Sequence, residues 1–99
     1  MMYVVRDVFN CKPGKVRPMV EKFKELSRLM AEMGQEPMRL LTDLSGEPYW
    51  TVIAESRVER LDDFFSAKQQ MDDERVRAAM AGYHDLVESG RREILRIEE

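Results

Sequence analysis

The chain has 99 residues, of which 43% are hydrophobic and 35% are charged, and its 16 basic and 19 acidic side chains give a formal net charge of −3. A chain of this length and composition is typical of one globular, water-soluble domain, which we place at residues 1–99. The acidic balance argues against a basic nucleic-acid-binding protein.

The cysteine content and the short apolar runs argue against disulfide-bonded, zinc-binding and membrane-spanning proteins. The single cysteine, Cys11, rules out an intramolecular disulfide and a zinc site built on paired cysteines. The apolar runs are far shorter than the roughly 18–20 residues needed to cross a bilayer. The first residues carry charge at Arg6 and Asp7 and lack the layout of a signal peptide. We therefore expect a cytoplasmic protein without a membrane role, a metal site or a cofactor.

The first third of the chain predicts a strand followed by a helix. Residues 3–11 are rich in Val, Tyr and Phe, which favours a strand, and Lys12-Pro13-Gly14 ends it. Residues 16–33 have apolar side chains at three- and four-residue steps, which predicts an amphipathic helix. Gly34 suits the cap at its carboxyl end.

The middle of the chain predicts a hairpin. Residues 38–44 and 49–56 both alternate apolar with polar side chains, and Gly46 and Pro48 mark a tight turn between them. By this alternation we expect Trp50 to lie in the core beneath the helices.

The last third predicts helix and then strand. A helical region begins near residue 58, and Asp73 is a candidate N-cap for a second piece over residues 74–87. Residues 91–98 form the last predicted strand, whose Leu95 and Ile97 we assign to the helix side of the sheet. The element order predicts a ferredoxin-like α+β fold (βαββαβ). This is a four-stranded antiparallel sheet with helices on one face and with the first and third strands central.

The face of the sheet that no helix covers has an unusual composition for a solvent-exposed surface. We expect apolar bulk there, together with an excess of arginine that comprises Arg6, Arg39, Arg92 and Arg96 against Asp43 and Glu55. Such a face predicts a two-fold homodimer with its sheets packed face to face, and a polar-lined cavity between sheet and helices. Asp7 falls on the helix side, which predicts either a strand bulge or a buried partner for its carboxylate.

Three stretches resemble a known family. YVVRDVFNCKPGKVRPMVEKFKEL, RLLTDLSGEPYWTVIAES and LVESGRREILRIEE are similar to small bacterial NIPSNAP-like members of the dimeric α+β barrel superfamily. That superfamily also contains cofactor-independent monooxygenases of the antibiotic-biosynthesis type and haem-degrading monooxygenases. The resemblance implies the fold and a homodimer, but no particular activity. Haem-degrading members use an Asn, a Trp and a His. Only Asn10 lies near the matching place, because Trp50 falls on a different element and the surroundings of His84 need not match.

Two functional hypotheses follow. In the first, the homodimer binds a small organic molecule, with cofactor-independent monooxygenase-like chemistry as one option and His84 as a weak candidate base. The residues predicted to orient the ligand are Arg6, Asn10, Arg39, Asp43, Tyr49 and Glu55. In the second hypothesis the protein is a non-catalytic structural or interaction dimer. There the arginines only pair with carboxylates, His84 faces solvent and Cys11 is inert packing.

Overall fold

The computed structural model describes residues 2–46, 48–66 and 73–98. Its elements are β1 (Tyr3–Cys11), α1 (Val16–Glu32), β2 (Arg39–Thr42), β3 (Thr51–Val58), α2 (Leu61–Ser66), α3 (Glu74–Met80), the short 3₁₀ helix η2 (Tyr83–Asp85) and β4 (Val87–Arg96). No helix in these ranges is both long and apolar enough to cross a membrane.

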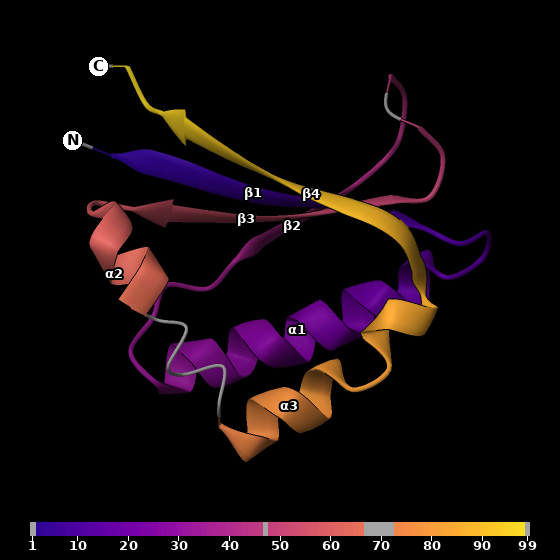
Figure 1. The fold of residues 1–99 in the computed structure, drawn as a ribbon, viewed down its shortest axis with the longest axis horizontal. Coiled ribbons are helices and arrows are strands. Elements are labelled where there is room, and N and C mark those ends of the chain that lie inside the picture. The colour runs from indigo at the N-terminus through magenta and orange to yellow at the C-terminus, as the bar shows by residue number, and fades with distance from the viewer. Residues whose placement is uncertain (1, 47, 67–72, 99) are drawn as a thin grey trace.

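The strands form one four-stranded antiparallel sheet in the order β2-β3-β1-β4. Figure 1 shows the helices on one side of this sheet, with the other side open. The ferredoxin-like prediction is therefore confirmed, with β1 and β3 central. The core lies between sheet and helices, where Met19 and Phe23 of α1 pack with Val52 and Ala54 of β3.

The predicted hairpin is shorter than its sequence pattern suggests. β2 ends at Thr42 and β3 begins at Thr51, so Trp50 lies just outside the strand. Trp50 adopts a left-handed backbone, with φ of 67°, and its side chain is 42% exposed. Its predicted place beneath the helices is wrong, because strand alternation does not continue into a left-handed residue. The Trp50 carbonyl instead accepts a hydrogen bond from the Cys11 amide at 2.8 Å, which fixes the turn to the end of β1.

The second helical region starts three residues later than expected and ends seven residues earlier. α2 begins at Leu61 and α3 ends at Met80, whereas the predicted limits were residues 58 and 87. The chain leaves the helix at Ala81, whose ψ is 132°, and Gly82 follows with a left-handed φ of 79°. The prediction for Asp73 is confirmed, since its carboxylate accepts a hydrogen bond from the Arg75 amide at 2.8 Å.

The faces of β4 are opposite to those predicted. Arg6 pairs directly with Glu93 and Val4 with Leu95, so Glu93 and Leu95 lie on the open face of the sheet. Arg92 therefore lies on the helix side, beside Asp7. Apolar residues occur at both parities near the end of β4, so hydrophobicity alone assigned the faces wrongly. In the observed register Asp7 lies opposite Arg92.

Candidate functional site

An ion pair lies on the helix side of the sheet. Arg92 Nε donates to Asp7 Oδ1 at 2.7 Å and Arg92 Nη2 donates to Asp7 Oδ2 at 3.3 Å. The Arg92 guanidinium also lies over the ring of Phe64, 5.0 Å from its centroid. Of the two alternatives predicted for Asp7, the structure shows a partner and no bulge at this residue, but the partner is not buried, because the Arg92 side chain is 42% exposed.

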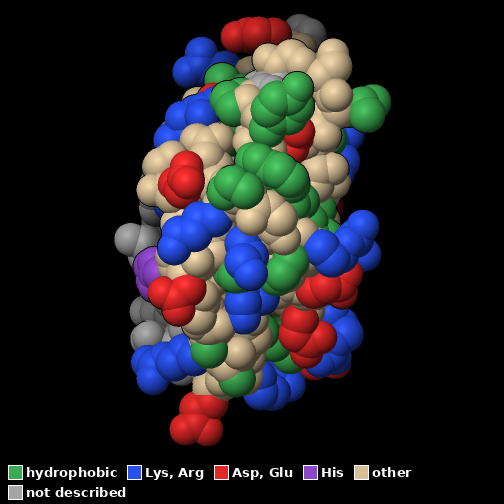
Figure 2. All heavy atoms as spheres, turned by 90° about the vertical axis from the view of Figure 1, so that its right-hand side faces the viewer, with side chains coloured by type: hydrophobic (Ala, Val, Ile, Leu, Met, Phe, Trp, Pro, Cys, Tyr) green, Lys and Arg blue, Asp and Glu red, His purple; other side chains and the backbone are tan. Residues whose placement is uncertain are grey.

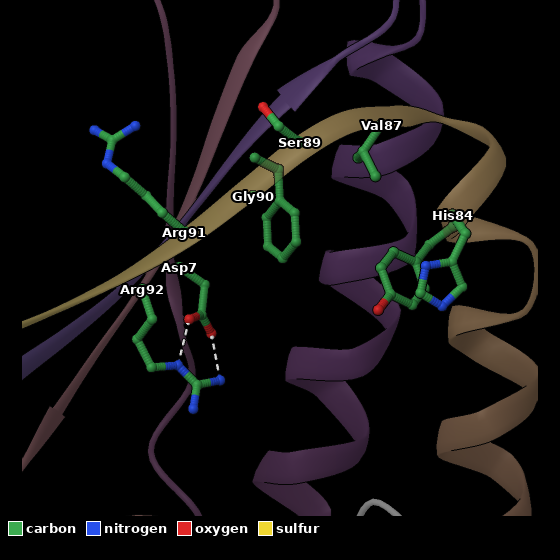
Figure 3. Close-up of a pocket in the computed structure, with 9 residues that line it drawn as sticks. Asp7, His84, Val87, Ser89, Gly90, Arg91 and Arg92 are labelled. Atoms are coloured by element: carbon green, nitrogen blue, oxygen red, sulfur yellow. Dashed lines mark hydrogen bonds and ion pairs between the residues drawn. The ribbon is translucent and has the colours of Figure 1, made fainter.

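This ion pair lies at the junction of an inner cavity and an outer cleft. An inner cavity of about 290 Å³ lies between the sheet and the helices, with mostly apolar walls that include Phe23, Leu26, Met30, Met38 and Phe64. An outer cleft of about 430 Å³ lies between β4 and η2 and is lined by Val87, Ser89, Gly90 and His84 (Figure 3). Asp7, Phe9, Tyr83 and Arg92 line both hollows and form the waist of what we call the two-lobed cavity.

Aromatic rings shape the waist. The ring of Phe9 packs against Phe23 with centroids 5.4 Å apart, and edge-on against Tyr83 at 6.3 Å. A Cβ atom on Gly90 would stand only 3.1 Å from Phe9 Cδ1, so the absence of a side chain there lets the ring lie over β4. The exposed His84 stacks on Tyr83 at 3.9 Å and lies in the wall of the outer cleft.

The open face of the sheet carries an alternating row of charges that crosses all four strands. Arg39 Nη2 and Arg6 Nε lie 2.7 Å and 3.8 Å from the two carboxylate oxygens of Glu55. Glu93 lies 3.8 Å from Arg6 Nη1 and 3.2 Å from Arg91 Nε. We call these five residues the ion ladder. Arg6 Nε is buried and has no hydrogen-bond partner in the part of the chain that the structure describes.

The other predicted ligand residues support the loop between β2 and β3. Asp43 Oδ1 accepts a hydrogen bond from the Thr51 amide at 2.9 Å, and Thr51 Oγ1 donates to the Pro48 carbonyl at 2.7 Å. Asn10 Nδ2 donates to Ser89 Oγ at 3.0 Å, while Tyr49 is 84% exposed.

The structure therefore divides the predicted ligand residues into two groups, and none of them lines the two-lobed cavity. Arg6, Arg39 and Glu55 meet in the ion ladder, whereas Asn10, Asp43 and Tyr49 belong to the loop and its base. Sequence reasoning missed the waist. The one feature of the sequence that pointed to the waist was Asp7, because it places a carboxylate on an otherwise apolar face of its strand.

Cys11 is buried in the core, as expected of a packing residue, with 3% of its surface exposed. Burial raises the pKa of its thiol, and the nearby negative charge of Asp43 raises that pKa further. Within residues 2–46, 48–66 and 73–98, no three His, Cys, Asp or Glu side chains are grouped to hold a metal ion.

Comparison with known proteins identifies solved structures that have a similar fold. No family model and no curated protein matches the sequence. A solved NIPSNAP family protein from Agrobacterium tumefaciens is similar to the chain with a TM-score of 0.83 at 20% identity, over 100% of this chain and 95% of that one. A NIPSNAP-like domain protein from Burkholderia xenovorans aligns with a TM-score of 0.75 at 15% identity, over 98% and 85% of the two chains.

A third structure adds a description of assembly. A protein from Bacteroides fragilis, described as dimeric, of ferredoxin-like fold and of unknown function, aligns with a TM-score of 0.70 at 17% identity, over 97% of this chain and 96% of that one. At these identities the likeness concerns the fold. The chain therefore has the ferredoxin-like fold that is found in solved NIPSNAP-family proteins, as the sequence resemblance predicted.

Proposed function

We propose that this protein is a homodimer that binds a small organic molecule in the two-lobed cavity. The observation that carries the proposal is the Asp7–Arg92 ion pair at the waist of a largely apolar cavity. Binding sites for small molecules are typically apolar hollows with a few convergent polar groups, and the inner cavity of about 290 Å³ suits a ligand of modest size.

The charges at the waist indicate which ligands fit. Asp7 accepts from Arg92 Nε and Nη2, and within the described residues Arg92 Nη1 makes no hydrogen bond, so it could donate to a ligand oxygen. The Asp7 carboxylate is an acceptor and suits a ligand hydroxyl. The pair is neutral as a whole, so it favours a neutral hydroxyl- or carbonyl-bearing head over a carboxylate, which Asp7 would repel. The apolar body of the ligand would occupy the inner cavity.

The open face of the sheet supports the homodimer. It combines the ion ladder with Leu95, whose surface is 47% exposed, and no helix covers it in Figure 1. A related fold from Bacteroides fragilis is described as dimeric. A two-fold contact would cover the face with its own copy.

Monooxygenase-like chemistry without a cofactor is the more specific form of this proposal. Asp7 would accept the proton of a ligand hydroxyl, and Arg92 would stabilise the resulting oxyanion. Dissolved dioxygen would be the oxidant: one of its oxygen atoms would replace two hydrogens of the ligand as a carbonyl oxygen, and the other would leave with those two hydrogens as water. His84, in the wall of the outer cleft, is the second candidate base.

The test compares matched ligands on matched variants. We expect 2-naphthol to raise the melting temperature and to give a calorimetric binding signal, with a weaker signal from 2-naphthoate. Asp7→Asn and Arg92→Met should each weaken naphthol binding at least fivefold. Arg39→Gln, on the open face, is the matched control and should leave binding unchanged. Oxygen uptake with phenols and quinols then tests catalysis.

Two outcomes would count against the proposal. If none of the hydroxyaromatic compounds binds, the cavity proposal fails. If binding instead falls in Arg39→Gln and not in Asp7→Asn, the ligand is held by the open-face residues that the sequence analysis named.

A second candidate function is a non-catalytic assembly module. It is favoured by the ion ladder, whose arginines pair with Glu55 and Glu93 inside one chain and so need no ligand. A stable dimer that binds no member of the ligand panel would support it.

A further inference from the structure

The outermost strand β4 has a free edge. It stands at the end of the strand order and, among the described strands, pairs only with β1. It has ten residues and is exposed along most of its length, whereas β2 at the other end of the sheet has four. Alternate residues of an antiparallel strand turn their N–H and C=O groups toward each edge, so the outer edge of β4 presents a row of backbone donors and acceptors.

The outer cleft runs along this edge. The residues of β4 that line it are Val87, Ser89, Gly90, Arg91 and Arg92. Neighbouring residues of a strand point to opposite faces of the sheet, so a hollow lined by the unbroken stretch 89–92 follows the edge of the strand and not one of its faces. Figure 3 shows Arg91 on one side of the β4 ribbon and Arg92 on the other.

Aromatic rings form the far wall and the floor of the cleft. The stacked rings of Tyr83 and His84 belong to η2, across the cleft from β4. The sequence has one histidine, and Figure 2 shows it in purple at the surface of the molecule. Gly90 has no side chain, so the ring of Phe9 lies over it and lines the cleft. A side chain brought in along the edge opposite Gly90 would therefore meet the Phe9 ring.

The charges at the cleft favour an acidic partner. Two arginines line it, Arg91 and Arg92, against the single carboxylate of Asp7. Asp7 holds Arg92, whereas Arg91 pairs through Nε with Glu93 at 3.2 Å and keeps a side chain that is 52% exposed. Arg91 follows Gly90 in the strand, so in an added strand the residue opposite Arg91 is next to the residue opposite Gly90.

We propose that the edge of β4 over residues 87–92 binds an extended segment of a partner protein, which joins the sheet as an additional strand. The segment places an aromatic side chain opposite Gly90, against Phe9 and Tyr83, and an acidic side chain next to it, opposite Arg91. Backbone hydrogen bonds along the edge supply the affinity, and these two positions supply the specificity. The inference goes beyond the proposed small-molecule site, because it needs no ligand in the inner cavity.

A short peptide tests the edge. The probe is the amidated hexapeptide TVFEVT with fluorescein at its amino end, and its anisotropy should rise saturably with protein. Two further peptides carry N-methyl groups on alternate backbone nitrogens, one on the odd positions and one on the even positions. Only alternate N–H groups of an added strand bond to β4, so one methylated peptide should bind at least tenfold more weakly and the other nearly as well as TVFEVT.

Three results would overturn the edge pairing. The first is equal binding of the two methylated peptides, and the second is no binding of TVFEVT. A protein that binds 2-naphthol but not TVFEVT would overturn this inference and leave the small-molecule site standing. The third is a peptide that converts a dimer into monomers in sedimentation, because the edge would then belong to the contact between two copies of the chain.

Exchange of charge tests the register. Arg91→Glu should weaken binding of TVFEVT severalfold and strengthen binding of TVFKVT, a gain that a damaged fold would not produce. TVAEVT, which lacks the aromatic ring, should bind about tenfold more weakly than TVFEVT. Arg17→Gln, at an exposed position on α1, is the matched control and should bind all three peptides as the wild type does. An Arg91→Glu protein that binds both charged peptides like the wild type would overturn the placement of the acidic residue.

Discussion

At the scale of single residues, the Asp7–Arg92 pair is the most informative contact. Its side chains are 28% and 42% exposed, so solvent screens the attraction and the pair is worth about 1 kcal/mol or less. We expect Asp7→Asn and Arg92→Met each to lower the free energy of unfolding by about 1 kcal/mol, with the double variant losing less than the sum. Urea unfolding of the four proteins measures this coupling, and strictly additive losses would show that the pair contributes nothing.

Gly90 is the second residue whose replacement gives a clear expectation. A methyl group there would meet Phe9 Cδ1 at 3.1 Å and Cε1 at 3.3 Å, so Gly90→Ala must displace the ring toward the waist of the cavity. Overpacking of this kind costs about 1 kcal/mol or more. The melting temperature should fall, and adding Phe9→Leu should recover part of the loss because the smaller side chain leaves room. A Gly90→Ala protein as stable as the wild type would mean that the ring moves freely.

The sequence identified single residues only where a local rule applied. Asp73 as a helix cap follows from its chemistry and position, and Asp7 could be recognised as needing a partner because it interrupts an apolar face. Arg92 could not be identified as that partner, since the register of β4 depends on pairing with a strand 85 residues away. Trp50 was misplaced for a related reason: its hydrogen bond to Cys11 joins segments that are distant in sequence.

At the scale of elements, the hydrophobic period predicted which segments are helices and which are strands, but not where they stop. α3 ends at Met80 because the backbone leaves the helical conformation at Ala81, and the apolar period continues past that point in the sequence. β2 and β3 lose residues to the loop because Asp43 and Thr51 bond to each other across it. The first limit is set by backbone conformation and the second by hydrogen bonds, and the spacing of apolar side chains reports neither.

The N-cap of α3 should make the stability of the fold depend on pH under acidic conditions. The Arg75 side chain, and then its backbone amide, hold the pKa of Asp73 below its usual range. On acidification the unfolded chain therefore binds this proton before the folded chain does. The stabilisation is complete above the ordinary aspartate pKa, at roughly 4, and is lost as the pH falls through the lower folded value.

Asp73→Asn keeps a side-chain acceptor for the Arg75 amide but removes the charge. We expect the melting temperature of this variant to fall less steeply between about pH 5 and pH 2 than that of the wild type. Thermal unfolding over this range gives the comparison. Identical slopes for the two proteins would show that Asp73 keeps its ordinary pKa in the folded state.

At the scale of the whole molecule, the order of the elements was sufficient to predict the ferredoxin-like fold, because few topologies satisfy right-handed connections and antiparallel pairing. The two-lobed cavity was not predictable in the same way. Its waist brings together Asp7 and Phe9 of β1, Tyr83 of η2 and Arg92 of β4, and their convergence depends on how the helices settle on the sheet. The sequence predicted that a cavity would lie between sheet and helices, but it assigned the ligand residues to the other face.

The ion ladder connects the stability of one chain to that of the proposed homodimer. Glu55 is its central anion, only 13% exposed, and it faces both Arg39 and Arg6. Glu55→Gln would remove this carboxylate from Arg39 and Arg6 and would leave Arg6 paired only with Glu93, at 3.8 Å, among the described residues. Removal of one partner costs up to about 1 kcal/mol at an exposed pair and about 3–5 kcal/mol at a buried one, so we expect a loss of about 2 kcal/mol.

In the proposed homodimer these two cations would also be buried between the sheets, so Glu55→Gln should raise the dimer dissociation constant about tenfold or more. Sedimentation over a concentration series measures this constant, and urea unfolding at a concentration where both proteins are monomeric measures the loss within one chain. Glu59→Gln is the matched control, because Glu59 is an exposed carboxylate between β3 and α2. A variant that loses stability as a monomer but dimerises like the wild type would place the contact between subunits away from the ion ladder.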